Sequence, residues 1–339
     1  MLRTLLGFIF AAGLVGFAPS VQANSAKRIQ KFVQIKQDRE LFVDWMPAKA
    51  GYQTVVVLNG LTYSTKQWDR FANSLHKMGY GLVRYDMIGM GQTLVKYAPV
   101  FKKIELADQV ADLKALISQL GLSRVNLLGL SYGGGVAIAF AAKNPSMVDK
   151  LILMAPFTQP VEGQDQWIKG QIWATRQLQP WNTSSDDELY DFFLKQIVYT
   201  TYPAAEPSVL ENPFKLEAVF RLVQGIRKWS FIEAARSLPT NSVHMIIAGK
   251  DQYIPLETLE KFWKEIPSSS RASLMVINDS EHKIPEDVPH YSASWVAEIL
   301  KGNPDLSSGR AFNGDSYTGV VTGPNGQQIK LPRELDGRN

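Results

Sequence analysis

The chain has 339 residues, of which 45% are hydrophobic, so it can bury a sizeable core without disulfide bonds or structural metals. It contains no cysteine, which excludes disulfide bonds, thiolate metal sites and a cysteine nucleophile. Its 36 basic and 32 acidic residues are mixed along the chain and give a net charge of +4, which excludes a dense basic surface for nucleic acid.

Residues 1–23 have the pattern of a secretory signal peptide. Arg3 supplies a positive charge, residues 5–15 form an apolar run, and residues 21–23 (Val-Gln-Ala) are typical of a cleavage site. The apolar run is short for a membrane-spanning helix. We therefore expect cleavage after Ala23 and an exported mature protein, periplasmic or secreted, without a membrane span. An uncleaved N-terminal anchor is the alternative.

Short apolar runs and helical periodicities alternate over much of the chain, which predicts an α/β fold. Predicted strands cover residues 31–36, 41–46, 54–58, 81–85, 125–128, 150–154, 243–248 and 272–277. Predicted helices cover residues 66–78, 104–120, 133–142, 256–266 and 291–300. The first two strands have the pattern of an antiparallel hairpin. The later alternation predicts a mostly parallel central sheet with helices on both faces, built from residues 29–155 and 240–301.

Residues 156–239 interrupt this alternation. They contain no convincing buried strand, and proline, asparagine and serine divide them into short helical pieces rich in aromatic residues. We interpret them as a helical cap inserted over the carboxyl edge of the sheet. Aromatic residues in such a layer can be plain core or can line a cleft, and a cap allows both.

Beyond Gly302 the chain is polar and rich in glycine and asparagine. This composition predicts a flexible C-terminal tail over residues 302–339, with a weak hairpin between residues 317–321 and 328–331.

Residues 129–133 (Gly-Leu-Ser-Tyr-Gly) connect the predicted strand 125–128 to a helix rich in small residues. A serine on so short a strand-to-helix turn takes a strained backbone conformation, and the two glycines leave room for the turn. The strain exposes the Ser131 hydroxyl above the sheet. It also directs the Tyr132 backbone N–H and the positive end of the helix dipole at the group that the hydroxyl attacks. Ser131 is therefore the candidate nucleophile.

A serine hydroxyl needs a base to take its proton. The histidines are His76, His244, His282 and His290. His282 follows the last predicted core strand, at the same carboxyl edge as Ser131, and is the candidate base. His290, at the start of the last helix, is its rival.

The base in turn needs a carboxylate to orient it. Asp251 follows the preceding strand in a Gly-x-Asp-x-x-x-Pro turn and is the candidate, although an aspartate there could simply stabilise the turn. Asp279 in the His282 loop is the second choice. The chain order Ser, Asp, His is the one that this class of hydrolase has. By position, the Leu61 N–H after the strand 54–58 is the best second oxyanion donor beside Tyr132 N–H.

With these motifs in order, the chain resembles the α/β-hydrolase family, specifically its capped lipase, esterase and proline-iminopeptidase-like branch. The motifs are residues 129–134, 86–93 (Asp-Met-Ile-Gly-Met-Gly-Gln-Thr), 249–255 and Glu281-His282. The resemblance covers about residues 31–300. It implies a Ser131, Asp251, His282 triad and an oxyanion hole formed by Leu61 and Tyr132.

The chain departs from the family pattern at three places. Asn59-Gly60 stands where the family usually has His-Gly, Thr93 replaces a serine, and Glu281 replaces the glycine before the active histidine. The serine at residue 131 argues against the dehalogenase and epoxide hydrolase branches, which use aspartate there.

The expected function is an exported serine hydrolase that cleaves an ester, or as second choice an amide, of a small apolar substrate. It needs no metal or organic cofactor. One alternative is an acyltransferase that uses the same triad and passes the acyl group to an alcohol or amine. Another is a non-catalytic binding module on the same scaffold.

Overall fold

The structure is a computed structural model that describes residues 27–100, 102–160 and 162–334. The predicted signal peptide lies outside them. The strands are β1 (Ile29–Lys36), β2 (Arg39–Met46), β3 (Thr54–Leu58), β4 (Gly81–Asp86), β5 (Val125–Leu130), β6 (Val148–Met154), β7 (Val243–Ala248), β8 (Arg271–Ile277), β9 (Arg310–Asp315), β10 (Val320–Thr322) and β11 (Gln328–Lys330). The helices are α1 (Asp69–Lys77), α2 (Gly91–Tyr97), α3 (Leu106–Gln119), α4 (Tyr132–Lys143), α5 (Glu162–Leu178), α6 (Asp186–Ala205), α7 (Lys215–Ile226), α8 (Ile232–Ala235), α9 (Leu256–Glu265), α10 (Ile284–Asp287) and α11 (Pro289–Lys301).

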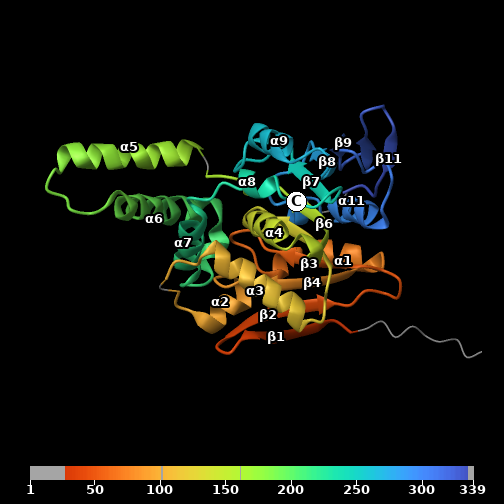
Figure 1. Cartoon of the computed structure of the whole chain (residues 1–339), viewed down its shortest axis with the longest axis horizontal. Coiled ribbons are helices and arrows are strands. Elements are labelled where there is room, and N and C mark those ends of the chain that lie inside the picture. The colour runs from red at the N-terminus through yellow and green to blue at the C-terminus, as the bar shows by residue number, and fades with distance from the viewer. Residues whose placement is uncertain (1–26, 101, 161, 335–339) are drawn as a thin grey trace, which may run out of the picture.

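The strands form one sheet in the order β1-β2-β4-β3-β5-β6-β7-β8-β9-β10-β11. Pairing is parallel from β4 to β9, while β1 and β2 at one edge and β10 and β11 at the other pair antiparallel. Residues of β4, β5 and β7 are buried throughout, as expected of central strands covered on both faces. Helix α1 packs against α11, and α3 packs against α4 (Figure 1). The predicted α/β architecture with a mostly parallel central sheet is confirmed.

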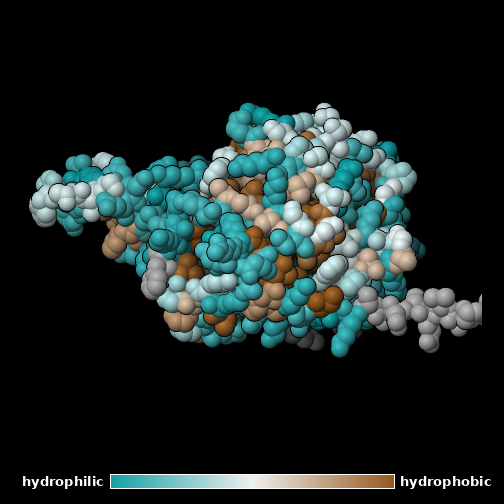
Figure 2. Space-filling model, turned by 60° about the horizontal axis from the view of Figure 1, so that its bottom comes forward, coloured by the Kyte–Doolittle hydropathy of each residue, from teal (hydrophilic) through white to brown (hydrophobic). Residues whose placement is uncertain are grey.

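Helices α5, α6 and α7 are inserted between β6 and β7, where the sequence predicts a cap. Helices α5 and α6 project from the body as a helical arm (Figure 1). Figure 2 shows the visible face of this arm as mostly hydrophilic or neutral. The insertion has a small apolar core of its own: Ile168, Leu194, Val198, Val209, Val219 and Phe220. Over the described ranges, no helix combines the length and the apolar character that a bilayer crossing requires.

The prediction of a flexible tail is wrong for residues 302–334. Strand β9 pairs parallel with β8 and extends the sheet, and β10 and β11 form the expected hairpin beside it. Phe312 is 1% exposed and packs edge-on against Trp295, with 5.3 Å between ring centroids. A Cβ at Gly314 would lie 2.3 Å from the Met275 side chain, so the glycine permits close packing. The polar composition of this segment therefore does not reveal that it forms ordered strands at the edge of the sheet.

Candidate active site

Ser131 lies between the end of β5 and the start of α4 and has a φ of 50° and a ψ of −115°. A positive φ at a non-glycine residue is strained and costs about 1–3 kcal/mol. Both flanking positions require glycine, because a side chain would not fit there. A Cβ at Gly129 would lie 2.5 Å from the Gly133 carbonyl oxygen, and one at Gly133 would lie 2.5 Å from the Leu58 carbonyl oxygen. The turn therefore has the strained strand-to-helix geometry that the sequence predicts.

The loops after β7 and β8 bring Asp251 and His282 together. His282 Nδ1 lies 2.7 Å from Asp251 Oδ2, and the two side chains are 10% and 1% exposed. The other carboxylate oxygen of Asp251 accepts the backbone N–H groups of Tyr253 and Ile254, each at 2.9 Å. One oxygen thus stabilises the turn while the other holds the imidazole, so the two interpretations of Asp251 are compatible.

The rival residues have other partners. His290 Nδ1 lies 2.5 Å from Ser74 Oγ, and Asp279 accepts hydrogen bonds from the Ser316 hydroxyl and backbone N–H at 2.6 and 3.1 Å. His244 is buried in β7, where burial lowers its pKa to about 3. Among the histidines, each of which falls in a described range, His282 is the one that lines the cavity at Ser131.

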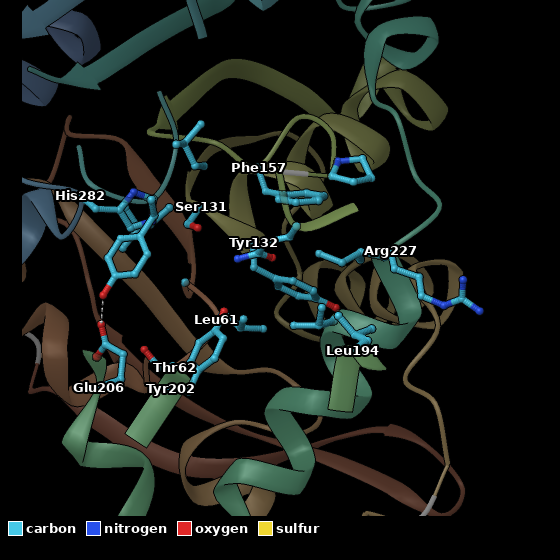
Figure 3. A pocket seen from close by; sticks show the side chains of 18 of the residues that line it. Leu61, Thr62, Ser131, Tyr132, Phe157, Leu194, Tyr202, Glu206, Arg227 and His282 are labelled. Carbon is cyan, nitrogen blue, oxygen red and sulfur yellow. Dashed lines mark hydrogen bonds between the residues drawn. The ribbon is translucent and has the colours of Figure 1, made fainter. Parts of the chain in front are cut away.

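Leu61 and Tyr132 line the same cavity as Ser131 and His282 (Figure 3). Tyr132 is the first residue of α4, so its backbone N–H has no acceptor within the helix and lies at the positive end of the helix dipole. Leu61 lies in the loop after β3. The structure therefore brings four of the five predicted residues to one cavity and places Asp251 behind the histidine.

The loop that carries Leu61 is held by buried polar contacts. Asp86 accepts the backbone N–H groups of Thr65 at 2.7 Å and Gln92 at 2.8 Å, and Asn59 Nδ2 donates to it at 3.2 Å. Burial raises the Asp86 pKa to about 6. Asn59, which stands where the family usually has histidine, also donates to the Tyr85 carbonyl oxygen at 3.1 Å and is therefore held by the neighbouring strand β4 rather than directed at the cavity.

The cavity has a volume of about 160 Å³ and mostly apolar walls, several of them from the inserted helices. The apolar side chains of the insertion that line it are Ile168, Leu194, Val223 and Ile226.

One side of the cavity is polar. Glu206 lies on this side (Figure 3). It accepts hydrogen bonds from the Tyr253 hydroxyl at 3.0 Å and from Lys283 at 2.6 Å. Sequence reasoning missed these three residues. Lys283 could have been found because it directly follows His282, and Tyr253 because it lies in the Asp251 turn. Nothing in the sequence around Glu206 marks it, since its position depends on the path of α6.

A model of the serine aminopeptidase S33 family matches residues 50–289. The chain belongs to this family of α/β hydrolases. The match includes the turn at Ser131, the inserted helices and the loops that carry Asp251 and His282. It ends before β9, so the last three strands lie outside the matched region.

Two curated proteins are similar to parts of this chain. A 2-hydroxy-6-oxononadienedioate/2-hydroxy-6-oxononatrienedioate hydrolase of Paraburkholderia xenovorans is 34% identical over 140 residues, which are 40% of this chain and 47% of the relative. A putative esterase/lipase of Haemophilus influenzae is 25% identical over 235 residues, 66% of this chain and 75% of that protein. The chain spans about half the length of the first of these relatives.

Solved structures support the fold of this S33 family member. An esterase from Exiguobacterium antarcticum superposes with a TM-score of 0.57 at 22% identity, over 80% of this chain and 100% of that one. An α/β hydrolase from a Medee basin deep-sea metagenome library superposes with a TM-score of 0.59 at 20% identity, over 80% and 98% of the two chains. At these identities the likeness establishes the fold alone.

Proposed function

We propose that the protein is a serine hydrolase that cleaves an ester, with an amide as the second choice, through an acyl-serine intermediate. The observation that carries the proposal is the shared cavity of Ser131 and His282, with the His282 ring held 2.7 Å from Asp251. A strained serine with a positive φ is the second support, because such strain persists where the surrounding structure over-determines it.

In the proposed mechanism the Ser131 hydroxyl oxygen attacks the substrate carbonyl carbon while His282 Nε2 takes the hydroxyl proton. Asp251 holds the imidazole in the tautomer that leaves Nε2 free and stabilises the imidazolium that forms. The backbone N–H groups of Leu61 and Tyr132 donate to the oxyanion. His282 then gives the proton to the leaving group, and the acyl group remains on Ser131. Water, deprotonated by His282, hydrolyses this ester and restores the serine.

The proposed substrate has a small apolar acyl or aromatic group. The apolar lining from the inserted helices supports this choice, because burying a methylene group contributes about 0.8 kcal/mol to binding. A cavity of about 160 Å³ fits a short chain or one ring better than a long acyl chain.

A panel of p-nitrophenyl esters graded by acyl length tests the proposal. We expect turnover with a maximum at short chains, and a fall of about 10⁴-fold or more in kcat for Ser131→Ala. Equal turnover by the wild type and the variant would refute the assignment of the nucleophile. Equal turnover at all acyl lengths would refute the proposed apolar specificity but not the assignment of the nucleophile.

We also propose that the protein is exported and that its signal peptide is cleaved after Ala23. The support is the charge, apolar run and small-residue site of residues 1–23. Mass spectrometry of the protein from a secreting host should give an N-terminus at Asn24. A full-length chain that remains in the membrane fraction would show an uncleaved anchor instead.

A further inference from the structure

We propose that the C-terminal strands β9–β11 position the loop that carries His282, with Ser316 and Asp279 as the positioning residues. This inference rests on the proposed function, because it concerns the rate at which Ser131 is activated. The strands lie beyond the region that matches the S33 family, and Figure 1 shows them beside β8 and α11.

The pairing of β8 with β9 continues past the end of β8. Ile277 and Gly314 are the last paired residues, and the Asn278 N–H then donates to the Gly314 carbonyl oxygen at 2.9 Å. The first residue of the histidine loop is thus held by β9. Gly314 allows this approach, because a Cβ there would lie 2.4 Å from the Tyr291 hydroxyl oxygen.

The next contact along the two segments is between Ser316 and Asp279. The Ser316 hydroxyl donates to Asp279 Oδ2 at 2.6 Å, and its backbone N–H donates to Oδ1 at 3.1 Å. Ser316 is fully buried and Asp279 is 9% exposed. A buried carboxylate is costly unless it accepts hydrogen bonds, so this pair fixes the backbone of the loop that leads to His282.

The same loop is joined to the Asp251 loop. The Lys250 N–H donates to the Ser280 carbonyl oxygen at 2.8 Å, between Asp279 and His282 in the chain. A shift at Asp279 would strain this junction and change the distance between the histidine and the carboxylate that orients it. Catalytic rates fall steeply when a reacting group is misplaced, by up to about 100-fold for 1 Å.

The end of the tail is anchored as well. The Glu334 carboxylate accepts the backbone N–H groups of His290 and Tyr291 at 2.8 and 2.9 Å, at the start of α11. The Glu334 N–H donates to the Ser316 carbonyl oxygen at 2.8 Å. Ser316 is thus held from both sides and is not a freely moving donor.

The test compares Ser316→Ala, Ser316→Thr and Asp279→Asn with the wild type. Ser307→Ala is the matched control, because Ser307 lies in the same extension and its hydroxyl donates to the Pro304 carbonyl oxygen, away from the histidine loop. The readouts are kcat and KM on an ester, the rate of labelling by a fluorophosphonate, and the melting temperature. We expect Ser316→Ala and Asp279→Asn to lower kcat and the labelling rate roughly 10-fold with KM within about twofold. Ser307→Ala should stay near wild type, and Ser316→Thr, which keeps the hydroxyl but adds a buried methyl group, should retain more activity than Ser316→Ala.

The outcomes separate this inference from the proposed function. A wild type that neither hydrolyses esters nor reacts with the probe overturns the proposed function and the inference with it. A reactive wild type whose Ser316→Ala and Asp279→Asn variants label at the same rate overturns the inference alone. So does a rise in KM at constant kcat in folded variants, because that points to a substrate contact instead of positioning.

Discussion

The Nδ1 atom of His282 lies 2.7 Å from Oδ2 of Asp251, and 31 positions of sequence separate the two residues. This contact decides which nitrogen of the imidazole is free to act as base. In Asp251→Asn the amide NH₂ would face Nδ1 and favour the tautomer with its proton on Nε2, which cannot accept the Ser131 proton. We expect kcat for ester hydrolysis to fall by about 10⁴-fold. A loss below about tenfold would contradict the assigned role of Asp251.

The elbow at Ser131 requires glycine at residue 133. A Cβ there would lie 2.5 Å from a backbone carbonyl oxygen, which cannot move as a flexible side chain can. Gly133→Ala should therefore destabilise the protein by about 1–3 kcal/mol or more and abolish hydrolysis. Gly170→Ala in α5 is the control, because no atom lies within 4 Å of its Cβ position, and it should stabilise by about 0.5–1 kcal/mol. Chemical denaturation measures both, and equal effects would contradict the steric argument.

The burial of His244 predicts that the stability of the protein depends on pH. Its Nδ1 lies 2.8 Å from Ser273 Oγ inside the sheet, and burial lowers its pKa from 6.5 to about 3. The unfolded chain binds the proton near pH 6.5 and the native chain only near pH 3. The free energy of unfolding therefore falls as the pH drops through this window, with a contribution of about 1.4 kcal/mol per pH unit.

His244→Gln removes this titration. Urea unfolding followed by tryptophan fluorescence should show a shallower loss of stability between pH 6.5 and 4.5 in the variant than in the wild type. Parallel pH profiles for the two proteins would mean that the native histidine is protonated in this range.

The inserted helices should set the preferred acyl length. Val223 of α7 lines the cavity, so Val223→Phe should shift the preference among p-nitrophenyl esters towards shorter chains and lower kcat/KM for the longest accepted ester roughly tenfold. Leu178→Phe is the control, because Leu178 is 75% exposed at the end of α5. An unchanged length profile in Val223→Phe would place the acyl group elsewhere.

The sequence predicts the central fold because buried parallel strands consist of short apolar runs, as in Thr54–Leu58 and Val243–Ala248. It also predicts the site residues, because the glycines around Ser131 and the turns after two strands are local patterns. Chain order then assigns Asp251 and His282 to the same edge of the sheet.

The last strands could not be predicted in the same way. Residues Arg310–Asp315 include Asn313 and Gly314, which disfavour a strand, and β9 forms because β8 offers an unpaired edge. The place of Glu206 is likewise set by the packing of α6 and by contacts with Tyr253 and Lys283, far away in the chain. Such positions depend on tertiary contacts that no local pattern contains.

The most direct test is the covalent reaction of Ser131 with a fluorophosphonate, followed by peptide mapping. We predict one adduct, on the Ser131 side chain, which is absent from Ser131→Ala and forms at least about 100-fold more slowly in His282→Ala. An adduct on another residue, or equal labelling of the wild type and Ser131→Ala, would contradict the assignment of Ser131 as the nucleophile.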